Sequence, residues 1–118
     1  MKDFRQLKVW EKAHQLTMAV YHITTFPREQ TYALASQMRR AASSIPSNIA
    51  EGCGRDGDPE LSRFCTIARG LANELEYQIL LARDLKLIAP HHYEQLSSLT
   101  VEVKRMLTVL IQKLNADR

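Results

Sequence analysis

Four long stretches with apolar residues at alternating spacings of three and four constrain this chain more than any other feature. The first stretch consists of Val9, Ala13, Leu16, Val20 and Ile23. This spacing places the side chains on one face of an α-helix. The same rhythm returns within residues 34–50, 64–88 and 96–114. Because no run alternates strictly between apolar and polar residues, the sequence predicts an all-α protein.

Clusters of proline and glycine separate these stretches. They are Phe26-Pro27, the run from Gly52 to Pro59, and Ala89-Pro90. We therefore expect helices over about 5–25, from after Pro27 to about Glu51, from Asp58, and from near Pro90 to about Asn115. Asp58 is a suitable N-cap for the third helix. Short connections make successive helices antiparallel, which predicts an up-down-up-down four-helix bundle.

The last stretch contains two candidate apolar faces. Its main seam is predicted to be Leu96, Leu99, Val103, Met106 and Leu110. Leu107, Ile111 and Leu114 are expected to flank that seam.

Pro46 interrupts the second predicted helix. Proline removes one backbone hydrogen bond and clashes with the carbonyl four residues earlier, here that of Ala42, which costs about 3 kcal/mol. Because the apolar rhythm continues through Ile49, we expect a kink and not an end. The hydroxyls of nearby Ser43, Ser44 and Ser47 are expected to donate hydrogen bonds to the backbone near the proline, where one hydrogen bond is lost.

The 118 residues are expected to form a single domain, residues 1–118, with 45% hydrophobic and 25% charged residues. No apolar run approaches the ~20 residues that a membrane span needs. The N-terminal residues lack the apolar core of a signal peptide, so we expect a cytoplasmic protein. Cys53 and Cys65 lack C-x-x-C spacing and are expected to be reduced.

Residue patterns typical of catalysis are not apparent. The four histidines do not form an i, i+4 pair with a nearby carboxylate. The glycines around Cys53 follow a predicted helix and not a strand, which argues against a phosphate-binding loop. We therefore expect no enzymatic activity, catalytic residue, metal or cofactor.

Basic residues are the main candidates for a binding surface in a chain whose net charge is +3. Arg5, Lys8 and Lys12 share one helical face, Arg39 and Arg40 lie in the second helix, and Arg55 and Arg63 flank the glycine-rich turn. These residues are candidate phosphate contacts. Alternatively, they are ordinary solvated charges, or pair with acidic groups across a subunit interface, Arg39 and Arg40 above all.

A second, more polar stripe accompanies the first helix and comprises Leu7, Trp10, His14, Thr17 and Tyr21. Two adjacent stripes indicate that this helix contacts more than one neighbour. Glu74 and Gln78 lie one turn apart on an otherwise apolar seam. They could make polar contacts between subunits or lie on a partly exposed flank. Leu7, Trp10, Tyr21, Glu74 and Gln78 are therefore candidate oligomer-interface residues.

The segment from Arg39 to Gly52 reads RRAASSIPSNIAEG. It resembles the central signature of the four-helix bundle proteins encoded in intervening sequences of 23S ribosomal RNA genes. Further matches, within about residues 4–88, are Leu7-Lys8-Val9-Trp10, Ala13, Thr25-Phe26-Pro27, Glu29, Tyr32, Leu34, Gln37, Phe64, Ile67-Ala68-Arg69-Gly70 and Glu74-Leu75-Glu76. The chain departs from the family pattern at Leu71, which is usually Ser, and at Cys65, which is usually Leu.

The resemblance implies a four-helix bundle that assembles as a homopentamer around a central channel. A similar protein, the accessory variability determinant of diversity-generating retroelements, partners a reverse transcriptase and binds nucleic acid through a basic surface. The resemblance implies no enzymatic activity. Two hypotheses follow: a homo-oligomeric, RNA- or DNA-binding accessory protein, or a protein-binding scaffold that does not contact nucleic acid.

Overall fold

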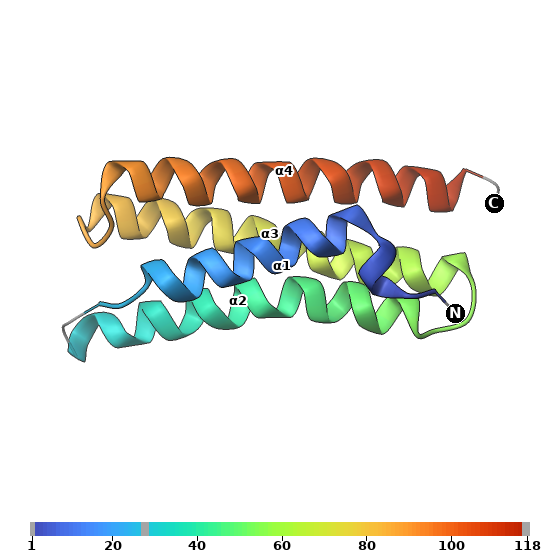
Figure 1. Ribbon diagram of the computed structural model, residues 1–118, viewed down its shortest axis with the longest axis horizontal. Coiled ribbons are helices and arrows are strands. Elements are labelled where there is room, and N and C mark those ends of the chain that lie inside the picture. The colour runs from blue at the N-terminus through green and yellow to red at the C-terminus, as the bar shows by residue number, and fades with distance from the viewer. Residues whose placement is uncertain (1, 27–28, 117–118) are drawn as a thin grey trace.

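The computed structural model describes residues 2–26 and 29–116 (Figure 1). It contains a short 3-10 helix, η1 (Phe4–Gln6), followed by α1 (Lys8–Ile23), α2 (Glu29–Cys53), α3 (Asp58–Asp84) and α4 (Pro90–Asn115). The four α-helices run alternately in opposite directions along a rod of 48 × 20 × 19 Å. Within the described residues there is no β-strand. The predicted all-α, antiparallel four-helix bundle is confirmed.

Each helix packs against two neighbours. α1 contacts α2 and α4, and α3 contacts the same two helices from the opposite corner. Between the described parts of the diagonal pairs, α1 with α3 and α2 with α4, there is no close backbone contact. The fully buried centre of the core is formed by Leu16, Met38, Ile45, Ile49, Leu75, Ile79, Leu96 and Leu107.

The core face of α4 differs from the predicted main seam. Its buried residues are Leu96, Thr100, Val103, Leu107, Ile111 and Leu114. Leu99, Met106 and Leu110 are only partly buried and pack at the edge of the core. Leu96 and Val103 are buried as predicted, but the prediction was wrong for the other three because the two faces have similar apolar periodicity, and the position of α1 and α3 decides which face is covered.

The helix ends explain the remaining differences from prediction. α1 begins at Lys8 and not near residue 5, because the Asp3 carboxylate accepts a hydrogen bond from the Arg5 N–H and caps η1 instead. α3 begins at Asp58, so Asp58 is its first residue and not its N-cap. Gly57 occupies the N-cap with φ of 85°, a left-handed conformation that glycine adopts readily. Pro27, in the first predicted break, lies outside the described residues.

α2 continues through Pro46, as predicted. The Ala42 carbonyl, which has lost its usual donor there, lies 2.9 Å from the hydroxyl oxygen of Thr17 on α1. The same hydroxyl lies 2.9 Å from the Ala13 carbonyl and can donate to one oxygen at a time. Ser43 and Ser47 donate to the carbonyls of Arg40 and Ser43 instead. The Ala42 carbonyl therefore accepts a hydrogen bond from Thr17 of α1, and not from the nearby serines.

α2 and α3 approach closely at Gly52. A Cβ atom at this position would lie 2.9 Å from the Phe64 Cβ and 3.0 Å from a methyl group of Leu61. Cys53 and Cys65 are buried beside this junction as free thiols. Burial raises the pKa of the Cys65 thiol to about 11. These thiols are accordingly packing groups held in their neutral form.

Candidate nucleic-acid interface

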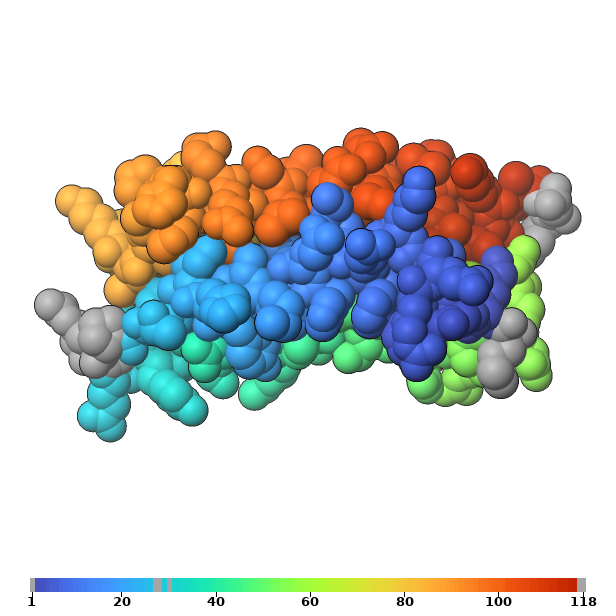
Figure 2. All heavy atoms as spheres, in the orientation of Figure 1, coloured from blue at the N-terminus to red at the C-terminus, as the bar shows by residue number. Residues whose placement is uncertain are grey.

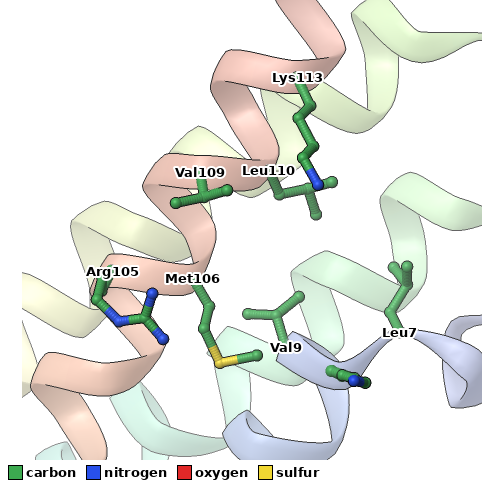
Figure 3. A pocket seen from close by; sticks show the side chains of 8 residues that line it. Leu7, Val9, Arg105, Met106, Val109, Leu110 and Lys113 are labelled. Atoms are coloured by element: carbon green, nitrogen blue, oxygen red, sulfur yellow. The ribbon is translucent and has the colours of Figure 1, made fainter.

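A groove runs between the start of α1 and the second half of α4, with a volume of about 290 Å³ (Figure 3). Its floor is aliphatic and is formed by Leu7, Val9, Met106, Val109 and Leu110. The basic side chains that line it are Lys8, Arg105 and Lys113. Met106 and Leu110 of the floor are among the α4 residues that the core leaves partly uncovered. The groove is therefore a consequence of which apolar face α4 packs into the core.

The basic residues of this groove differ in how they are neutralised. Arg105 donates to the Glu102 carboxylate at 2.8 Å, and this hydrogen bond lowers the pKa of Glu102 and raises that of Arg105. Within the described residues, Lys8 and Lys113 have no carboxylate close enough for an ion pair. These two ammonium groups can therefore meet an external anion without breaking an ion pair within the described part of the chain.

The other predicted basic residues of α1 and of the α2–α3 turn lie toward the same end of the bundle. Figure 1 places the start of the chain, the turn after α2 and the end of α4 together there. The Lys2 N–H donates to the Cys53 carbonyl at 2.9 Å, which ties the N-terminal segment to that turn. Lys12 lies near Glu102 of α4 and helps to lower its pKa. Cations from three separate segments therefore converge on one end.

Several of these cations already have partners. Arg5 pairs with Asp3, Arg55 with Glu51, and Arg63 with Glu60. Arg55 and Arg63 also lie over the ring of Phe64, at 5.3 and 4.5 Å from its centroid. All three ion pairs are exposed, and such pairs contribute little to stability and exchange readily. The arginines can consequently turn toward a phosphate.

Arg39 and Arg40 lie elsewhere, beside the end of α1. The Arg39 Nε donates to the Thr24 hydroxyl at 2.9 Å, and an Nη donates to the Thr24 carbonyl at 3.2 Å. Arg39 therefore caps the C-terminal end of α1, where cations are favoured. Arg40 is exposed and lies on the neighbouring surface. The seven predicted residues thus form two groups and not one continuous patch.

Sequence analysis missed Arg105 and Lys113. Their signal is that they lie eight residues apart on α4, with Val109 midway between them on the same helix face. Such a spacing can be read from the sequence, but only the packing of α1 against α4 brings Lys8 into the same groove as these two residues.

The predicted interface residues also separate into distinct environments. Leu7 and Trp10 are partly buried and pack against the core, whereas Tyr21 is 46% exposed. The Trp10 ring lies between Phe4, at a centroid distance of 4.9 Å, and a stacked His14, at 5.2 Å. Trp10 is therefore largely engaged within its own chain.

Glu74 and Gln78 do not share one environment. Glu74 is exposed, while Gln78 is only 5% exposed. The Gln78 amide donates to the Glu74 carboxylate at 3.3 Å, and the Gln78 carbonyl oxygen is buried without a partner among the described residues. Glu74 lies on the outer face of α3, which also exposes Ile67, Tyr77 and Leu85. Within the described bundle, no other helix covers these exposed side chains.

The described part of the chain offers no metal centre, since no three His, Cys, Asp or Glu side chains are grouped there. Glu11 and His14 have Glu-x-x-His spacing, but the His14 ring is stacked on Trp10. Among the described helices, none is both long and apolar enough to cross a membrane.

The fold and this surface define a small antiparallel four-helix bundle with a basic end and an aliphatic groove beside it. The chain belongs to the 23S rRNA-intervening sequence protein family, whose model matches residues 5–109.

A crystal structure of a protein of unknown function from the S23 ribosomal protein family of Bacteroides thetaiotaomicron VPI-5482 has a similar fold. Its TM-score is 0.80 at 23% sequence identity, over 88% of this chain and 95% of the other. A search of curated proteins finds no match.

Proposed function

We propose that this protein is a non-enzymatic, homo-oligomeric accessory protein that binds RNA or DNA through the basic end of the bundle. The observation that carries the proposal is the convergence of Lys8 and Lys113 on one groove, without internal ion pairs among the described residues. Arg5, Lys12, Arg55, Arg63 and Arg105 extend this surface. Cations clustered in this way are the usual contacts to nucleic-acid phosphates.

Assembly would strengthen this interaction. One copy carries a net charge of +3, so a pentamer would carry about +15 and would bind polyanions with a strong dependence on salt. The uncovered outer face of α3 supports assembly, because Ile67, Tyr77 and Leu85 are 41%, 61% and 55% exposed. Large apolar side chains exposed along one helix face are candidates for subunit contacts. Glu74 on the same face would provide a polar contact within the interface.

The test is a titration of the intact protein with a structured RNA at two salt concentrations, together with light scattering. Replacing Lys8 and Lys113 with Gln should lower the slope of log affinity against log salt by about one per lysine. Lys86→Gln, at the opposite end of the bundle, is the matched control and should leave the slope unchanged. A wild-type oligomer that does not bind RNA at low salt would contradict the nucleic-acid proposal, and a monomer at micromolar concentration would contradict assembly.

The aliphatic floor of the α1–α4 groove favours a second candidate, a scaffold that binds another protein, such as a reverse transcriptase. Leu7, Met106 and Leu110 offer apolar contacts that a phosphate backbone cannot use. An amphipathic helix with acidic flanks would use both the floor and the basic side chains. An intact oligomer that fails the RNA titration would leave this scaffold function.

A further inference from the structure

A second polar site lies on the other flank of α1, toward α2. Tyr21, Tyr32, Ser36, Arg39 and Arg40 line a pocket of about 300 Å³. It belongs to neither the aliphatic groove nor the basic end of the bundle. In Figure 2, α1 faces the viewer with α4 above it and α2 below it, so the two flanks point in different directions.

One wall of this pocket is held in place by hydrogen bonds. Arg39 donates to the hydroxyl and the carbonyl of Thr24, and the Thr24 side chain is 1% exposed. The Arg39 guanidinium lies 5.1 Å from the centroid of the Tyr21 ring. A cation over one aromatic face orients that ring. Arg39 and Tyr21 therefore form a positioned pair at the end of α1.

The remaining groups of the pocket are available to a ligand. Tyr21 and Tyr32 are 46% and 69% exposed. Arg40 is exposed, and within the described residues no carboxylate forms an ion pair with it. None of the pocket-lining residues is acidic. The pocket thus combines aromatic faces, a hydroxyl group and two guanidinium groups, without a negative charge to repel an anion.

This combination suits a nucleotide whose base is not paired. An unpaired base can stack on an aromatic ring or an arginine plane, whereas the bases of a duplex already stack on one another.

We propose that this pocket binds one unpaired nucleotide of a single-stranded RNA or DNA, with the base against Tyr21 and Tyr32 and a phosphate at Arg40. The inference rests on the proposed nucleic-acid function and deepens it by naming single strands as the preferred form.

The experiment compares the affinity of the intact protein for a short oligouridylate and for heparin, a polyanion without bases. Tyr32→Ala should weaken oligouridylate binding about tenfold and leave heparin binding unchanged. Arg40→Gln should weaken the binding of both and lower the salt dependence by about one charge. Tyr93→Ala is the control, because Tyr93 of α4 also has an arginine, Arg83, over its ring but lies outside the pocket, the groove and the outer face of α3, and should have no effect.

Three outcomes would overturn this inference alone: equal losses for Tyr32→Ala and Tyr93→Ala, a loss of heparin binding in Tyr32→Ala, or a change of oligomer mass in Tyr21→Ala. The last outcome would assign Tyr21 to a subunit contact. A wild-type protein that binds neither polyanion would instead contradict the proposed function itself, and this site with it.

Discussion

The α2–α3 junction and the two flanks of α1 are packed differently. At Gly52, α2 and α3 are so close that a single added Cβ would clash with Phe64. By contrast, grooves of about 290 and 300 Å³ flank α1, toward α4 and α2 respectively. α1 has 16 residues, whereas α2, α3 and α4 have 25, 27 and 26. The shorter helix covers less of its neighbours, so the open grooves lie beside α1, while α2 and α3 pack closely against each other.

The two flanks of α1 also differ from each other. Toward α4 the surface is aliphatic and carries two lysines and Arg105, whereas toward α2 it carries two tyrosines, Ser36 and two arginines. The α2 flank is further joined by a hydrogen bond from Thr17 to the carbonyl freed by Pro46. One short helix thus presents two chemically distinct surfaces.

The largest expected effect on stability comes from a substitution that disturbs the close packing of α2 against α3. Gly52→Ala should lower the free energy of unfolding by about 2 kcal/mol, because its Cβ would lie 2.9 Å from that of Phe64. Gly70→Ala should raise it by about 1 kcal/mol, because no atom lies within 4 Å and alanine favours the helix. Thermal or urea unfolding of both variants measures the difference. Equal stability would show that α2 and α3 are not tightly packed there.

The next effect concerns alkaline pH. The folded-state pKa of Cys65 is about 11 against 9.0 for an exposed thiol, because burial disfavours the thiolate. The unfolded chain therefore loses this proton first, and stability should fall by about 2 kcal/mol as the pH rises from about 9 to 11. Cys65→Ala should remove most of this pH dependence. Urea unfolding of both proteins across the range provides the comparison, and parallel pH profiles would contradict it.

The smallest effect tests how α1 is held to α2. Thr17→Val keeps the side-chain shape but removes the donor to the Ala42 carbonyl, which should cost about 1 kcal/mol. In a Pro46→Ala background the restored N–H can serve that carbonyl, so the same substitution should cost less. The double-mutant cycle measures this coupling. An identical cost in both backgrounds would show that Thr17 acts without reference to Pro46.

Helix boundaries that depend only on neighbouring residues in the sequence were predicted well. Pro90 fits only the first turn of a helix, and α4 begins there as expected. Asp58 was misplaced by one residue, because the left-handed φ of Gly57 moves the helix start. Met106 and Leu110 were assigned to the core seam, yet they form the floor of an open groove. The periodicity identified both apolar faces of α4 but could not show which one is buried in the core.

The sequence by itself determined four amphipathic helices, their boundaries to within a few residues and their antiparallel order, because periodicity and chain breaks act over one or two turns. Only the tertiary structure decided which cations are available to a ligand. Arg39 and Arg40 are adjacent in the chain, yet Arg39 is held by Thr24, while Arg40 is exposed. The physical reason is that a side chain's partner is set by residues distant in sequence, whereas its place on a helix is set by its nearest neighbours.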